Sequence, residues 1–117
     1  MPGAYLDDHE VSVVRARGLV EADSAWLLDV RENYEWQAGH APGAHHIPLA
    51  DLETRQLELP ETEQILVICH SGGRSRIATD ALNRADYAAA NVAGGMAAWQ
   101  ASGGAVVMAD GAPGAVG

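Results

Sequence analysis

Residues 65–84, ILVICHSGGRSRIATDALNR, carry the clearest structural signal in the chain. The apolar run Ile65–Ile68 leads directly to Cys69, which is the only cysteine in the sequence. An unbroken apolar run of this length is typical of a parallel strand buried on both faces. The Gly72–Gly73 pair allows a tight loop after the cysteine, and a helix is expected over Arg74–Arg84. The stretch therefore predicts a strand, a loop and a helix, in that order.

Similar apolar runs alternate with helical segments along the rest of the chain. We expect further strands at Trp26–Val30, His45–Ile47 and Ala90–Ala93, and an edge strand at Val11–Val14. Besides 74–84, we expect helices over Asn33–Ala38 and Met96–Ser102. In the helix 74–84, the spacing favours a buried face made of Ile77, Ala78, Ala81 and Leu82. Alternating strands and helices predict an α/β fold with a small parallel β-sheet of about five strands, flanked by helices on both faces.

The length of 117 residues is that of one domain with its own hydrophobic core. We expect this core to span about 11–107, with Met1–Asp8 loose and 109–117 a flexible tail rich in small residues. Neither a signal peptide at the start of the chain nor an apolar run near the length of a membrane span is visible. The formal net charge of -9 argues against nucleic acid and anionic membranes as partners. A cytoplasmic protein is expected.

The position of Cys69 favours a nucleophile. Ligands of open α/β sheets bind at the carboxyl ends of the strands, where Cys69 is expected to lie. A Gly-Gly loop and a helix N-terminus can both point N–H groups at the sulfur, and such groups stabilise a thiolate. The alternative is an unreactive cysteine that only packs in the hydrophobic core. A single cysteine excludes an internal disulfide, a CxxC pair and a multi-cysteine zinc site.

A metal site is disfavoured. Its candidate ligands would be Cys69 and the histidines His40, His45, His46 and His70. Adjacent histidines on a strand point to opposite faces, and no ligand spacing fits these positions. His70 is also a weak candidate for a general base, because neighbours in a curled loop tend to diverge. No metal and no organic cofactor are expected.

Three separated motifs resemble those of the single-domain rhodanese-like sulfurtransferases. They are LLDVRENYEWQAGHAPGAHHIPL at 27–49, ILVICHSGGRS at 65–75 and NVAGGMAAWQASGG at 91–104. The resemblance covers roughly Val11 to Val107, and it implies a small parallel sheet flanked by helices. It also implies transfer of a sulfane sulfur from thiosulfate or a persulfide donor to cyanide, a small thiol or a protein thiol.

By this resemblance Cys69 is the catalytic residue, which carries the sulfur as a persulfide. The loop residues around it would bind the substrate sulfur; they are His70, Ser71, Gly72, Gly73, Arg74 and Ser75. Arg31 matches a family arginine that can bind the anionic donor. The GHxPGA turn with His40, Pro42 and Gly43 is expected to be structural, Trp36 and Trp99 to lie in the core, and Gly94–Gly95 to begin the last helix. Asp86 departs from a common glycine, which should cost some stability, and Ala105 from a frequent proline.

Two other functions remain open. A related phosphatase or arsenate reductase would resemble Cys-x5-Arg, whereas Cys69 and Arg74 enclose four residues, which suits a smaller cradle. A non-catalytic binding module of the same family would usually lack the cysteine. Arg31 is likewise open: it either binds the donor or pairs with a carboxylate such as Asp29 or Glu35 to hold the fold.

Overall fold

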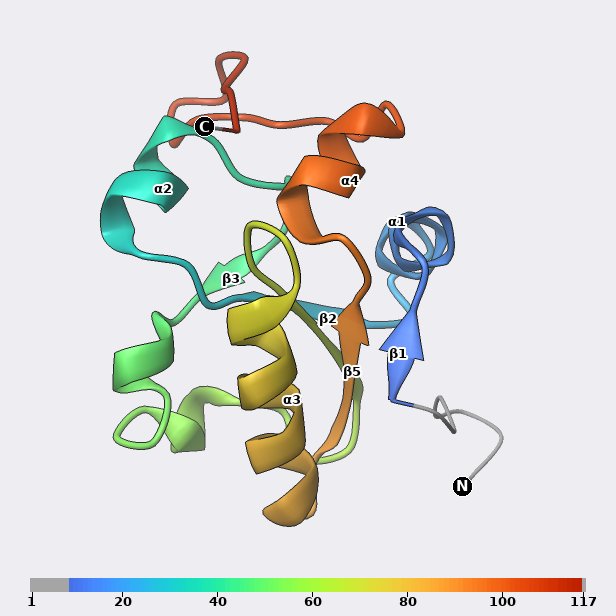
Figure 1. The fold of residues 1–117 in the computed structure, drawn as a ribbon, viewed down its shortest axis with the longest axis vertical. Coiled ribbons are helices and arrows are strands. Elements are labelled where there is room, and N and C mark those ends of the chain that lie inside the picture. The colour runs from blue at the N-terminus through green and yellow to red at the C-terminus, as the bar shows by residue number, and fades with distance from the viewer. Residues whose placement is uncertain (1–8, 117) are drawn as a thin grey trace.

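The computed structural model describes residues 9–116, and five strands of this part of the chain form one sheet (Figure 1). All strand pairs are parallel, and the spatial order is β1-β5-β4-β2-β3. The strands are β1 Glu10–Val11, β2 Trp26–Asp29, β3 His45–His46, β4 Gln64–Ile68 and β5 Ala88–Val92. The central strand β4 is buried throughout, as its apolar sequence predicts. The expected parallel α/β sheet is confirmed.

Helices cover both faces of this sheet (Figure 1). They are α1 Val13–Glu21, α2 Asn33–Ala38, α3 Gly73–Arg84 and α4 Gly95–Ala101, with 3-10 turns η2 Leu49–Asp51 and η3 Gln56–Glu58. Successive β4 side chains point to opposite faces. Ile65 and Val67 therefore pack with α3, whereas Leu66 and Ile68 pack with α1 and α4. Two apolar layers thus hold the strand that leads to Cys69.

The expected edge strand at Val11–Val14 is confirmed only at Val11 and is wrong after it. Only Glu10–Val11 pairs with β5, and α1 begins at Val13. Ser12 ends the strand because its side chain caps the helix and accepts a hydrogen bond from the Arg15 N–H at 3.2 Å. The serine cap thus outweighs the strand propensity of the β-branched residues around it.

The expected buried face of α3 is also corrected. Ile77 is 61 % exposed and Ala81 is exposed, whereas Ala78 and Leu82 are buried as expected. The buried face is completed by two polar residues, Ser75 and Thr79. Helical spacing alone does not choose between neighbouring faces, and here the rotation of the helix turns Ser75 toward Cys69.

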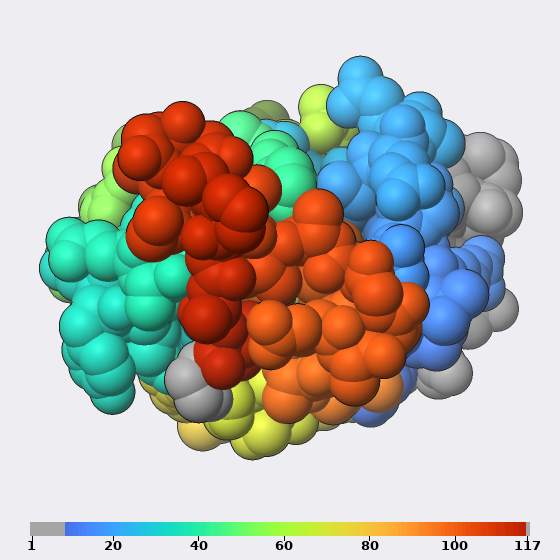
Figure 2. Space-filling model, turned by 90° about the horizontal axis from the view of Figure 1, so that it is seen from above, coloured from blue at the N-terminus to red at the C-terminus, as the bar shows by residue number. Residues whose placement is uncertain are grey.

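Asp86 adopts a left-handed φ of 71° after α3, which is the conformation that the usual glycine at this place would favour. The C-terminal segment crosses between α2 and α4 (Figure 2), and the Ala115 N–H donates to the Ala38 carbonyl at 3.0 Å. The flexibility expected for 109–117 stays a prediction, and the expectation for Met1–Asp8 lies outside the described residues. No helix within 9–116 has the length and apolar character that crossing a bilayer requires.

Candidate active site

The Cys69 sulfur lies in a cradle of donors between β4 and α3. The N–H groups of Gly72 and Ser75 donate to Sγ at 3.1 Å and 3.3 Å, and the Ser75 hydroxyl lies 3.2 Å from it. Gly72 has a φ of 116°, which a residue with a side chain rarely adopts, and this turn directs its N–H inward. Cys69 itself is 1 % exposed. The loop therefore brings Cys69, Gly72 and Ser75 together as the sequence predicts.

These donors change the acidity of the thiol. Burial alone raises the pKa of Cys69, because it disfavours the charged thiolate. The Ser75 hydroxyl and the N–H groups of Ser75, Gly72 and Ser71 act in the other direction, and the pKa of Cys69 is lowered overall. Since the thiolate is the nucleophilic form, the cradle favours a reactive rather than an inert cysteine.

Helix α4 holds the outer side of this loop. The Met96 N–H donates to the Cys69 carbonyl at 2.7 Å, and the Ala97 N–H donates to the His70 carbonyl at 3.0 Å. With both carbonyls bound to α4, the loop is held in the orientation in which its N–H groups face Sγ. Gly95 makes this contact possible, because a Cβ there would lie 2.4 Å from the Cys69 carbonyl oxygen.

Replacing Gly95 with alanine is therefore expected to damage both stability and the loop. The residue has a φ of 60°, and its new Cβ would also displace the carbonyl that Met96 binds. We expect a loss of about 2–3 kcal/mol in the free energy of unfolding, measured by urea denaturation, and a matching loss of thiol reactivity. Gly43→Ala is the control, since Gly43 has a φ of 79° but open space around its Cβ position. Equal costs for the two variants would show that the contact with Cys69 is unimportant.

The Arg74 side chain does not point at the sulfur but forms a fork with Glu35 of α2. Its Nη1 and Nη2 donate to the two carboxylate oxygens at 2.7 Å and 2.9 Å. The hydrogen bond from Arg74 lowers the pKa of Glu35 to about 2, and the pKa of Arg74 is raised in return. Because the pKa of Glu35 is lower in the folded state than in the unfolded state, the ionised carboxylate stabilises the fold. This stabilisation is complete above the ordinary pKa of 4.5 and is lost as the pH falls toward about 2. The pair ties the cysteine loop to α2.

Arg31 is buried and paired, with 1 % of it exposed. Its Nε and Nη2 donate to the Asp29 carboxylate, and Nη2 also donates to the Gly39 carbonyl at 2.8 Å. This is the ion pair that the structural interpretation expects. None of these bonds uses Nη1, and Arg31 lines an open pocket of about 260 Å³ together with Tyr34, Glu35, Ala38 and His70. Arg31 is thus a buried anchor of the fold and also a lining residue of the pocket next to the cysteine loop.

Three of the histidines stack on two tryptophans. His40 stacks on Trp36 at 3.6 Å between ring centroids and pairs through its backbone with Val107, as the structural role of its turn requires. His46 also stacks on Trp36, whereas His45 stacks on Trp26. Trp36 is only half-buried, so its expected place in the core is corrected, while Trp99 is buried at 4 % exposed.

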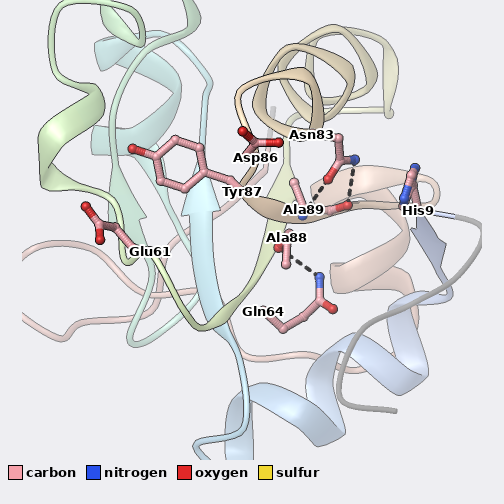
Figure 3. A pocket seen from close by; sticks show the side chains of 8 residues that line it. All are labelled: His9, Glu61, Gln64, Asn83, Asp86, Tyr87, Ala88 and Ala89. Carbon is pink, nitrogen blue, oxygen red and sulfur yellow. Dashed lines mark hydrogen bonds between the residues drawn. The ribbon is translucent and has the colours of Figure 1, made fainter. Parts of the chain in front are cut away.

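Another pocket lies at the opposite end of the sheet, near the amino ends of β4 and β5 (Figure 3). Its amide side chains already have partners: Asn83 donates to the Ala89 carbonyl and accepts from the Ala89 N–H, and Gln64 donates to the Ala88 carbonyl. No cysteine lines this hollow, which lies at the other end of β4 from Cys69.

Two polar residues at the site were missed by the sequence interpretation. Glu35 was considered only as a partner for Arg31, although it holds Arg74. Asn91 is a lone polar residue in the strand β5, and it accepts a hydrogen bond from the Ser75 hydroxyl. A polar residue that interrupts an otherwise apolar buried strand is the signal that could have found it.

Comparisons with known proteins agree with this geometry. Residues 12–102 match the family model described as "Rhodanese-like domain". The "Putative sulfurtransferase YtwF" of Bacillus subtilis is 35% identical over 81% of this chain and 93% of its own length. The "Putative sulfur carrier protein YrkF" of the same organism is 39% identical over 77% of this chain, which spans 50% of that protein. The crystal structure of a rhodanese-related protein from Thermoplasma volcanium superposes with a TM-score of 0.80 at 26% identity, covering 85% of this chain and 97% of that one.

Proposed function

The chain belongs to the rhodanese-like domain family, and from that premise we propose that it is a sulfurtransferase in which Cys69 carries a sulfane sulfur as a persulfide. The observation that supports this most strongly is the set of N–H and hydroxyl donors around Sγ of the only cysteine. Relatives whose names describe a sulfur carrier and a sulfurtransferase support the same class of chemistry.

The proposed reaction has two steps. The Cys69 thiolate attacks the outer sulfur of thiosulfate, a new S–S bond forms at Cys69, and sulfite leaves with the electron pair of the broken S–S bond. An acceptor such as cyanide or a thiolate then attacks the terminal sulfur of the persulfide, takes it, and returns Cys69 to the thiolate. Charge and sulfur balance in each step, so no cofactor is required. The scheme is covalent catalysis with ping-pong kinetics.

The loop donors have the same task in both steps. They stabilise an anion at or next to Sγ, first the thiolate and then the persulfide. A persulfide donor would follow the same first step, with a thiolate leaving in place of sulfite. We propose small sulfur donors and acceptors as partners, with a protein thiol as a further acceptor.

Mass spectrometry of the protein after thiosulfate treatment tests the central step. We expect one added sulfur atom, which is lost again when cyanide is added. A protein that gains no sulfur from thiosulfate or from an alkyl persulfide would contradict the proposal. An aryl phosphate assay on the same sample separates it from a phosphatase, for which no hydrolysis is expected.

Glu35 is expected to set how well the site accepts a dianionic donor. Its carboxylate pairs with Arg74 and Asp29 pairs with Arg31, so the arginine of the cysteine loop and the one that lines the pocket are both compensated. Glu35→Gln should raise kcat/KM for thiosulfate relative to that for an alkyl persulfide, which carries a single charge, by about three- to tenfold, since the charge of Arg74 is then uncompensated and attracts the dianion more strongly. Glu61→Gln, the same change at an exposed position in the distant pocket, should leave the ratio unchanged. Equal losses with both donors would mean that Glu35 only holds the loop.

A further inference from the structure

The Ser75 hydroxyl has two neighbours that compete for its single proton. Its Oγ lies 3.2 Å from the Cys69 sulfur and within hydrogen-bond distance of the Asn91 carboxamide oxygen. All three residues are buried: Cys69 is 1 %, Ser75 0 % and Asn91 4 % exposed. A hydroxyl can donate only one hydrogen bond, so it cannot serve sulfur and Asn91 at the same time.

The direction of the hydrogen bonds that join Cys69, Ser75 and Asn91 depends on whether the sulfur is a thiol or a thiolate. When Cys69 is a thiol, its S–H can donate to Ser75, and Ser75 can donate to the Asn91 oxygen. When Cys69 is a thiolate, Ser75 must donate to the sulfur, and its oxygen then needs a donor behind it. The carboxamide can supply that donor, because rotation about its last torsion exchanges the oxygen for the NH₂ group.

We propose that Asn91 is a positioning residue for Cys69, which turns either its oxygen or its nitrogen toward Ser75 and so directs the hydroxyl proton away from or toward the sulfur. An amide suits this place better than a carboxylate, which only accepts, or an apolar side chain, which does neither. The inference rests on the proposed function only in the reaction that it assigns to the thiolate. The hydrogen-bond chain itself concerns the acidity of Cys69.

The position of Asn91 in β5 suits this role. It lies on β5 two residues before Ala93, so the same strand leads into Gly94–Gly95 and the α4 contact with the loop. Its Nδ2 would be 3.8 Å from a Cβ on Gly72, whose N–H is one of the sulfur donors. Asn91 therefore binds the hydroxyl that holds Sγ and lies beside the Gly72 turn.

The test is the pH dependence of iodoacetamide alkylation, which reports on Cys69 alone because the chain has no other thiol. In Asn91→Leu the hydroxyl loses the donor behind it, and because charge-assisted bonds are the stronger ones, the thiolate suffers more than the thiol. We expect the apparent pKa of Cys69 to rise by about half to one unit. Asn91→Asp keeps the shape and the acceptor but loses the donor and adds a negative charge. It should raise the apparent pKa by about one unit or more.

Controls distinguish positioning from a general structural effect. The ionisable groups around Cys69, namely His70, the Arg74–Glu35 pair and the Arg31–Asp29 pair, are unchanged in every variant. Gln64→Leu removes another buried amide, at the far end of β4, and should lower stability without moving the Cys69 pKa. In a Ser75→Ala background Asn91→Leu should cause no further shift, because its effect passes through the hydroxyl.

Two results would overturn the proposal. One is an unchanged Cys69 pKa in both Asn91 variants, and the other is a full Asn91→Leu shift in the Ser75→Ala background. If Asn91→Leu does not fold, Asn91→Asp alone decides the first point. If the variants show these pKa shifts but the wild-type protein takes up no sulfur, the sulfurtransferase proposal is contradicted and this one stands.

Discussion

Cys69→Ser is expected to abolish sulfur transfer and to leave the fold intact. The chain has no second thiol that could carry the sulfur, and a serine hydroxyl is not ionised at neutral pH. We expect the thiosulfate:cyanide turnover to fall by at least about three orders of magnitude, to the background without enzyme. Serine is close in size to cysteine, and its oxygen can accept from the Gly72 and Ser75 N–H groups that now contact Sγ.

The melting temperature of the same variant is the control. Cys69 is buried within the apolar layer that includes Val67 and Ala78, so a role in packing alone would appear as a lower melting temperature with turnover retained. Persulfide formation, followed by mass spectrometry, should be lost together with turnover. Retention of wild-type turnover would show that the sulfur is not carried on Cys69.

Arg31→Ala is expected to have the largest effect on stability. The variant leaves the Asp29 carboxylate, which is 0 % exposed, without its guanidinium partner and leaves the Gly39 carbonyl without its donor. Breaking a buried ion pair from one side costs about 3–5 kcal/mol, because the remaining charge stays buried and uncompensated. Urea denaturation measures this loss in the free energy of unfolding.

A double replacement and two sulfur donors separate the roles of Arg31. Asp29→Leu combined with Arg31→Met removes both charges, so it should cost less than Arg31→Ala alone. In Arg31→Ala the uncompensated Asp29 charge lies beside the pocket, and kcat/KM for thiosulfate should fall about ten- to a hundredfold. Transfer from an alkyl persulfide, which carries one negative charge rather than two, should fall less. Equal losses with both donors, after correction for the unfolded fraction, would assign Arg31 to the fold alone.

The strands and most helices could be predicted because their signals are local. Ile65–Ile68 is apolar without interruption, and Asn33–Ala38 coincides with α2. The Gly72–Gly73 pair likewise predicts a tight turn at which N–H groups could converge, and the positive φ of Gly72 confirms this turn. By contrast, α1 was missed because Val11–Val14 has a strand-like composition, and a single serine cap decided against it.

The sequence by itself determined the alternation of strands and helices, the place of the cysteine after a buried strand, and the glycines that let its loop curl. These depend on neighbouring residues and on backbone geometry, which are written in consecutive positions. Only the tertiary structure decided the partners: Glu35 for Arg74, Asp29 for Arg31, Asn91 for Ser75 and Met96 for the Cys69 carbonyl. Most of these contacts join elements that are distant in sequence, and each buried polar group takes whichever partner the packing of the sheet and helices brings within hydrogen-bond distance.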